Sequence, residues 1–136
     1  MSEWATFPYL PVAGAAGLMP LVPITLGYES RRIETQGLID SGATVNVLPY
    51  SVGLQLGLNW ESETRVIYLT GMPGRQEARA ILVNAAVAGF AFTRLAFAWS
   101  RSDDVRLIIG QTNFFLTFDV QFRRSDLAFD LRSRQA

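Results

Sequence analysis

Hydrophobic positions along the chain follow, for the most part, the spacing of short β-strands. Apolar runs rich in β-branched residues recur between turns that contain Gly, Pro or charged residues, a pattern typical of consecutive hairpins. The predicted strands are residues 20–27, 32–39, 64–69, 78–87, 90–99, 118–122 and 127–131. Because an open sheet of so many short strands leaves unprotected edges, the pattern favours a mainly β fold with a closed or partly closed barrel.

Two short helices interrupt the strand pattern. One is predicted at residues 51–56, with Ser51 as its N-cap after Pro49, and the other at residues 111–116, directly after Gly110. The chain of 136 residues suits a single domain. We divide this domain into an N-terminal strand and Gly/Ala loop at 1–19, a core barrel at 20–131 and a tail at 132–136.

An uncharged stretch at residues 4–28 has the composition of a membrane or targeting segment. Its prolines and glycines break or weaken any helix, and a secretory signal needs a positively charged start where this chain has Glu3. We therefore expect two short strands around a Gly/Ala loop at 13–17 instead of a signal or an anchor.

The composition removes most familiar catalytic chemistry. The chain has no His and no Cys, and its basic residues are all Arg. These absences exclude Ser-His and Cys-His nucleophiles, zinc sites built on His or Cys, haem ligation, Schiff-base lysines and the P-loop lysine. Asp and Glu are the remaining side chains that commonly act as general acid or base near neutral pH. An enzyme of this composition is expected to work with carboxylates.

Charge and cysteine usage limit the partners and the compartment. The 12 acidic residues balance the 12 basic ones, so no basic field gathers nucleic acid or an anionic membrane, and we expect neither as a partner. The absence of Cys gives no sign of an oxidising compartment, and we expect a cytoplasmic protein.

One carboxylate stands out by its position, that of Asp40. In residues 37–43 (Gly-Leu-Ile-Asp-Ser-Gly-Ala), an apolar pair anchors the strand in the core and delivers Asp40 to its end. Gly42 lets the backbone turn tightly, so that nearby N–H groups can face the carboxylate. Ser41 adds a hydroxyl that can bond across a symmetric contact. By itself, however, Asp-Ser-Gly is an ordinary turn sequence.

A second apolar run changes the interpretation of this motif. Residues 105–111 (Val-Arg-Leu-Ile-Ile-Gly-Gln) end in Gly-Gln and lead into the second predicted helix and a Phe-rich strand. The two motifs together resemble those of the retropepsin-like aspartic proteases of bacterial type, single-domain relatives of the retroviral proteases. That family carries Asp-Thr/Ser-Gly-Ala/Ser after a hydrophobic pair and, far downstream, two hydrophobic residues plus Gly before a short helix. The resemblance covers most of the chain, from about residue 24 to residue 131.

Further segments fit the same family, with two departures. Residues 47–49 look like the segment after its catalytic loop, and residues 118–120 are similar to its closing strand. Retroviral members usually pair an acid at the position of Thr44 with an Arg at the position of Gln111, and this chain lacks that ion pair. Its expected flap also has Pro73 where retroviral flaps have Gly or Ile.

The resemblance implies a small closed β-barrel of the acid-protease type, with one lobe per chain. The family's active site needs two facing Asp residues, and this chain holds one Asp-Ser-Gly. The other aspartates do not fit, because Asp103 and Asp104 lie in a polar turn and Asp119, Asp126 and Asp130 lie on or beside the last strands. The resemblance therefore implies a symmetric homodimer that hydrolyses peptide bonds of a peptide or protein substrate through a water activated by Asp40 and Asp40′. It implies neither a metal nor a cofactor.

Roles near the dyad follow from the resemblance in the same way. Asp40 is the expected acid or base, and Ser41 and its copy brace the two active loops across the dyad. Gly42 and Ala43 are expected to bind the substrate main chain close to the reaction centre.

Substrate-binding residues further from the dyad have a purely structural alternative. The expected flap residues are Gly71, Met72, Pro73 and Gly74. This turn either folds over the peptide and excludes water or is an inert hairpin. Met72, Val47 and Ile108 are expected to line apolar pockets, although the last two can instead be core residues.

Several alternatives remain open. The same fold, flap and groove could hold an extended peptide without cutting it, as a catalytically silent dimerisation or peptide-binding module. Asp103 and Asp104 could supply part of a Mg²⁺ or Ca²⁺ site, although a solvated loop fits two adjacent acids better. The arginines near the C-terminus could touch RNA or lipid, although interleaved acids favour a self-neutralised hairpin. Dimerisation is expected to use a terminal strand, at 5–10 or at 118–122.

Overall fold

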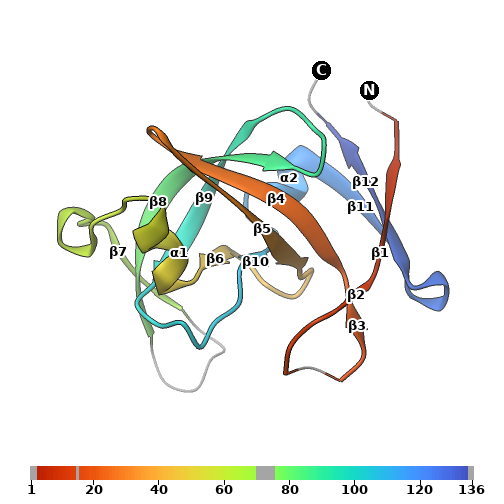
Figure 1. Ribbon diagram of the computed structural model, residues 1–136, viewed down its shortest axis with the longest axis horizontal. Helices are drawn as coiled ribbons and strands as arrows, with labels where there is room; N and C mark the ends of the chain where they lie inside the picture. Colours follow the sequence, from red (N-terminus) through yellow and green to blue (C-terminus); the bar gives the residue numbers. More distant parts are fainter. Residues whose placement is uncertain (1–2, 15, 70–75, 135–136) are drawn as a thin grey trace.

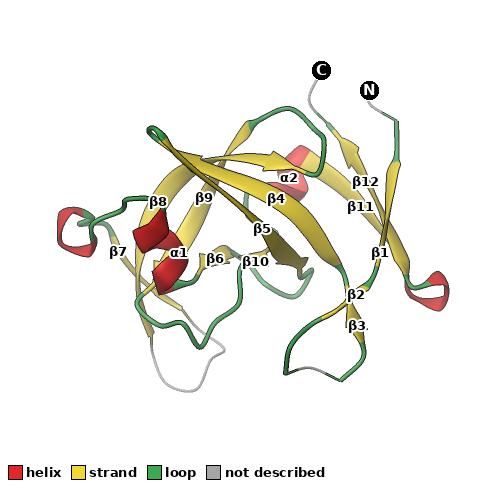
Figure 2. Ribbon diagram, in the orientation of Figure 1, coloured by secondary structure: helices red, strands yellow, loops and turns green. Residues whose placement is uncertain are grey.

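The computed structural model describes residues 3–14, 16–69 and 76–134. Six strands form a barrel in the order β4-β5-β10-β6-β9-β8, and the ring closes because β4 also pairs with β8. Their bounds are Leu21–Tyr28 (β4), Arg31–Ile39 (β5), Asn46–Leu48 (β6), Gln76–Val87 (β8), Thr93–Ser100 (β9) and Ile108–Ile109 (β10). Strand β7 (Val66–Leu69) extends the sheet beyond β8. The predicted mainly β fold with a closed barrel is confirmed (Figure 1; Figure 2).

The hairpin of β8 and β9 differs from the predicted one at its turn. The predicted strand at 90–99 begins at Thr93, because the connection after β8 occupies the intervening residues and starts with Ala88 at a φ of 55°. Phe90 lies in this connection and packs edge-on against Phe118, with ring centroids 5.4 Å apart. The Phe90 side chain therefore holds a turn in place and does not belong to a strand.

A second, three-stranded sheet is built from both ends of the chain, in the order β1-β12-β11. Its strands are Ala5–Pro8 (β1), Phe118–Arg123 (β11) and Ala128–Ser133 (β12), with the 3₁₀ turn Arg124–Asp126 (η2) between the last two. The first and last strands consequently lie side by side (Figure 1). The short ribbon of β2 (Leu10–Pro11) and β3 (Leu18–Met19) matches the two strands expected around the Gly/Ala loop.

Both predicted helices exist, and both begin at a different residue than predicted. Helix α1 spans Tyr50–Gln55 with Pro49 as its N-cap residue, so the prediction of Ser51 as N-cap is wrong. The Ser51 N–H instead donates to Asp103 Oδ1 at 2.8 Å, so a carboxylate from a distant loop satisfies the first turn. Helix α2 is a single turn at Phe114–Thr117, because the residues before it bond to other segments. No helix within the described ranges is long and apolar enough to cross a membrane.

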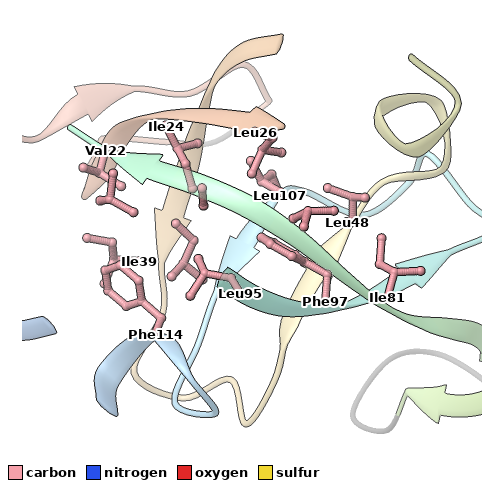
Figure 3. Packing of buried hydrophobic residues seen from close by; sticks show 14 of the residues in the cluster. Val22, Ile24, Leu26, Ile39, Leu48, Ile81, Leu95, Phe97, Leu107 and Phe114 are labelled. Atoms are coloured by element: carbon pink, nitrogen blue, oxygen red, sulfur yellow. The ribbon is translucent and has the colours of Figure 1, made fainter. Parts of the chain in front are cut away.

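The main hydrophobic core fills the barrel (Figure 3). Alternate residues of each strand point inward, and Val22, Ile24 and Leu26 of β4 are at most 2% exposed. Other strands contribute Ile39, Leu48, Ile81, Val83, Leu95, Phe97 and Ile109. This burial removes large apolar side chains from water and fixes the strand register, because a shift of one residue would turn them outward.

An aromatic cluster joins α1 to the barrel. The Trp99 ring stacks on Tyr50 with a centroid distance of 5.6 Å and meets Trp60 edge-on at 5.2 Å. Trp60 belongs to the 3₁₀ turn Trp60–Ser62 (η1). A Cβ at Gly53 would lie 2.1 Å from Trp99 Nε1, so glycine is required for α1 to approach this ring.

Candidate active site

Asp40 lies at the end of β5, where the chain leaves the barrel. The preceding residue, Ile39, is 3% exposed and points into the main core near Phe114 (Figure 3). Asp40 itself is half-buried, and its N–H donates to the carbonyl of Ile109 at 2.9 Å. The buried strand therefore presents one carboxylate at a fixed point on the barrel surface, as the apolar pair before it predicts.

A tight turn follows Asp40 and directs a main-chain donor at its carboxylate. The Gly42 N–H donates to Asp40 Oδ1 at 2.9 Å, and the Ala43 N–H donates to the Asp40 carbonyl at 3.2 Å. A Cβ on residue 42 would lie only 3.3 Å from the same carboxylate oxygen, so glycine gives this turn its room. Ser41 is exposed at the tip of the turn, where its hydroxyl can meet a second molecule.

A second loop, directly after β10, is bonded to the Asp40 loop. The Gln111 N–H donates to the Ala43 carbonyl at 2.9 Å, and the Thr112 N–H donates to the Thr44 carbonyl at 2.8 Å. The side chains of the same two residues add bonds from Gln111 Nε2 to the Ser41 carbonyl and from Thr112 Oγ1 to the Thr44 carbonyl. These bonds brace the loop where retroviral proteases use an ion pair, so the departure at Thr44 and Gln111 leaves the loop held.

Val47 and Ile108 lie next to each other in a second apolar cluster, outside the main core. They are register partners on β6 and β10, and Val47 is 4% exposed while Ile108 is partly exposed. The cluster consists of Val47, Leu69, Ala78, Ala98 and Val105, with Val45, Ile67 and Ile108 packed against it. Because Ile108 is the register partner of both Val47 and Leu38, this cluster lies in the part of the sheet from which the Asp40 loop begins and to which it returns.

Nothing in the sequence pattern indicates that Leu69, Ala78 and Ala98 belong to this cluster. A buried strand residue looks the same in sequence whichever side of the barrel wall it faces. The pairing of β7 with β8 and of β8 with β9 places the three together, and the pairing of β6 with β9 sets Val47 opposite Ala98. This cluster of small and branched side chains is therefore a product of the topology.

The four expected flap residues, Gly71, Met72, Pro73 and Gly74, lie outside the described residues. The hairpin that leads to them is present, because β7 and β8 pair antiparallel with Leu69 opposite Gln76. Since Leu69 belongs to the second cluster, the base of this hairpin contributes to that cluster.

The other aspartates with described partners are used elsewhere. Asp103 accepts the Ser51 N–H, and the described chain contains no group of three or more acidic side chains placed to hold a metal ion. On the terminal sheet, arginines and acids alternate in ion pairs. These pairs are Arg123–Asp126 (2.6 Å), Arg123–Asp130 (2.8 Å), Arg132–Asp119 (2.8 Å) and Arg134–Asp119 (3.3 Å). The geometry supports a self-neutralised hairpin.

These ion pairs change the titration of two acids. The Arg123 guanidinium, with help from the Thr6 hydroxyl, holds the pKa of Asp130 below its ordinary value. The Arg132 guanidinium, followed by the charge of Arg134, lowers the pKa of Asp119 against the opposing effect of desolvation. Both carboxyls are therefore poor candidates for a proton donor or acceptor near neutral pH.

Comparison with known proteins supports the fold. No protein-family model matches this sequence, and no curated protein matches it. A solved structure, described as a retropepsin-like aspartic protease from Rickettsia conorii, matches over 96% of this chain and 96% of its own, with a TM-score of 0.64 and 15% sequence identity. The chain therefore has the fold of a retropepsin-like aspartic protease, with a closed six-stranded barrel and two short helices.

Proposed function

We propose that this protein is an aspartic endopeptidase that acts as a symmetric homodimer. The observation that carries the proposal is the placement of Asp40: a half-buried carboxylate in a glycine turn, braced by a second loop, with the second apolar cluster in the part of the sheet from which its loop begins. The same fold in a protein described as an aspartic protease supports this choice of activity.

The homodimer follows from the count of usable acids. An aspartic peptidase needs two carboxylates in contact, and the described chain offers Asp40 alone in a suitable turn. Asp103, Asp119, Asp126 and Asp130 already accept hydrogen bonds from Ser51 or from arginines. The second carboxylate is therefore proposed to be Asp40′ of an identical subunit.

Electrostatic repulsion gives the two carboxylates different protonation states and therefore different roles. Two such groups a few ångströms apart do not both ionise near neutral pH, so the pair shares one proton and titrates in two macroscopic steps. The ionised member takes a proton from a bound water, whose oxygen attacks the scissile carbonyl carbon. The protonated member donates to the carbonyl oxygen. A proton then reaches the leaving nitrogen as the C–N bond breaks, which gives one carboxylic acid and one amine.

Neighbouring residues are proposed to hold the substrate. Main-chain groups of Gly42 and Ala43 bind an extended peptide, and Ser41 with its copy braces the paired loops. Val47 and Ile108 are proposed to line a pocket for apolar side chains, since both belong to the second cluster and Ile108 is partly exposed. The residues at 71–74 are proposed to close over the peptide as a flap.

Replacing Asp40 with Asn tests the proposal. Wild-type protein is incubated with a diverse peptide library from about pH 3 to about pH 7, and products are read by mass spectrometry. We expect cleavage by wild type and by Asp104→Asn, an exposed control, and no cleavage by Asp40→Asn, which still forms a dimer in sedimentation. A wild type that binds peptides and cuts none would instead indicate a silent binding module.

A further inference from the structure

The buried amide of Asn46 joins three segments around the Asp40 loop. Asn46 is the first residue of β6 and is fully buried. Its Nδ2 donates to the Ala96 carbonyl on β9 at 2.9 Å, and its Oδ1 accepts the Gly110 N–H at 2.7 Å. An amide side chain carries the same donor and acceptor as a peptide group. The Asn46 side chain therefore extends the hydrogen-bonding of the sheet between β9 and the end of β10.

A second asparagine completes this arrangement. Asn113, which has a positive φ of 78°, accepts the Ala96 N–H on its Oδ1 at 2.7 Å. Its carbonyl accepts the Thr117 hydroxyl at 2.9 Å, which ties the same residue to α2. Both main-chain groups of Ala96 are thus held by side-chain amides, one from the start of β6, directly after the Asp40 loop, and one from the loop after β10.

Gly110 transmits this restraint to Asp40. A Cβ at this position would lie 2.6 Å from the Ala43 carbonyl oxygen and 2.8 Å from that of Val45, so the two loops are in closest contact here. The residue before Gly110 accepts the Asp40 N–H, and the residue after it donates to Ala43. The Asn46 amide, which accepts the Gly110 N–H and donates to Ala96, therefore fixes the position of both loops relative to β9.

We propose that Asn46 is a positioning residue for Asp40, and that it needs both an acceptor and a donor to act. This inference rests on the proposed function for its catalytic consequence. Its structural part stands on the hydrogen bonds alone. An ionised carboxylate at residue 46 would place a second oxygen against the Ala96 carbonyl. An apolar side chain there would leave the Ala96 carbonyl and the Gly110 N–H unpaired.

The substitution Asn46→Asp gives a switchable version of the same side chain. When protonated, the introduced carboxyl would donate to the Ala96 carbonyl and accept the Gly110 N–H, as Asn46 does. When ionised, it can only accept, so burial and the Ala96 oxygen favour the protonated form and raise its pKa in the folded chain. The folded state then binds more protons than the unfolded one above about pH 4, and stability falls as the pH rises from there.

Charged residues on neighbouring segments must not obscure this titration. They are Arg94 on β9, Arg106 just before β10, and Asp40 itself; both arginines are exposed. In the described chain the hydrogen bonds of the Asn46 amide go to main-chain groups. The unfolding experiment is therefore done with Asp40→Asn in every variant, which removes the titration of Asp40 and any self-cleavage.

The structural test measures urea unfolding of Asn46→Asp and Asn46→Ala at about pH 4 and about pH 7, on either side of the expected titration. We expect Asn46→Asp to approach the parent at the lower pH and to lose stability at the higher one, while Asn46→Ala is impaired at both. The control is Asn84→Asp, exposed on β8, which should show no such divergence. An Asn46→Asp chain that unfolds alike at both pH values, or is unfolded at both, would overturn the proposal.

The catalytic test uses chains that retain Asp40. At about pH 4, we expect Asn46→Ala to lower kcat by roughly 10- to 100-fold with little change in KM, because a small misplacement of a catalytic group costs this much, and Asn46→Asp to recover most of the rate. Full activity in Asn46→Ala would overturn the positioning role while leaving the peptidase standing. If wild type cuts nothing, the peptidase proposal fails, and the unfolding comparison still decides the role of Asn46 in the fold.

Discussion

At residue 110 the chain tolerates no side chain, because two loops cross there. The Ala43 and Val45 carbonyl oxygens lie 2.6 and 2.8 Å from where a Cβ would stand, and both are main-chain atoms that cannot move without shifting the Asp40 loop. Gly89 provides a contrast, because a Cβ there meets nothing within 4 Å. The two glycines therefore allow a matched comparison of a crowded position with an open one.

We expect Gly110→Ala to lower the free energy of unfolding by about 1–3 kcal/mol or more, the usual cost of overpacking, and to abolish peptide cleavage. Gly89→Ala should stay within about 1 kcal/mol of wild type, because its effect is mainly on the entropy of the unfolded chain. Urea unfolding and a peptide-cleavage assay measure both effects. Equal stability and activity of the two variants would contradict the crowding derived from the Ala43 and Val45 carbonyls.

Sequence patterns predict a residue's role where its chemistry is local. Asp40 and Gly42 could be identified because an apolar strand, an acid and a glycine follow each other directly, and the structure places Gly42 N–H against the carboxylate. Asn46 could not, since its two partners are 50 and 64 residues away in the chain. Asp103 is similar, because its bond to the Ser51 N–H joins positions 52 residues apart.

Among the elements, the terminal sheet depends most on charge. Asp130 is 7% exposed, lies on the central strand β12, and accepts bonds from Thr6 on β1 and from Arg123 on β11. All three strands of the sheet are therefore connected through one carboxylate. The predicted hairpin at 118–131 is confirmed in its strands, whereas the role of β1 as third strand depends on a pairing between the two ends of the chain.

The lowered pKa of Asp130, caused first by Arg123, makes the terminal sheet sensitive to acid. Because the carboxyl has a lower pKa folded than unfolded, its contribution to stability is present above about pH 4 and is lost as the pH falls through the folded pKa. We expect the midpoint temperature of unfolding to decrease as the pH is lowered below about 4, and to decrease less steeply in Asp130→Asn. Thermal unfolding followed by circular dichroism measures both slopes. Glu34→Gln, at an exposed position of β5, should retain the wild-type slope, and an unchanged slope in Asp130→Asn would contradict the assignment.

On the scale of the whole molecule, the sequence pattern predicts the closed barrel better than it predicts the surroundings of the candidate active site. Many short strands imply closure because edges must be protected. The second apolar cluster could not be predicted, because it combines Val47, Leu69 and Ala98 from three strands that are distant in sequence and that the strand order β6-β9-β8-β7 brings together. Closure pairs the strands of the ring on both sides, whereas the terminal sheet keeps two edge strands, with β1 on one side and β11 on the other.

The two edges differ in what they offer to a second copy. The Tyr9 N–H bonds to Leu127 on the β12 side, so alternation directs the peptide groups of Thr6 and Pro8 outwards, and Pro8 has no N–H to donate. The Arg134 N–H bonds to Thr117, so the same alternation directs the groups of Val120 and Phe122 on β11 outwards. Strand β11 therefore offers the better edge for antiparallel pairing with its own copy across a twofold axis.

If the proposed dimer forms through β11, removing one outward N–H should dissociate it and leave the fold intact. We expect Val120→Pro to be folded by circular dichroism, monomeric in sedimentation and inactive on peptides, since the lost donor faces away from β12. Val120→Thr keeps the N–H and nearly the same shape, so it should remain dimeric and active. A Val120→Pro protein that stays dimeric would exclude pairing through β11, and dissociation by Thr6→Pro alone would move the contact to β1. If Asp40→Asn stays dimeric and Val120→Pro is monomeric, loss of cleavage in both variants would indicate that one chain supplies only half of the site.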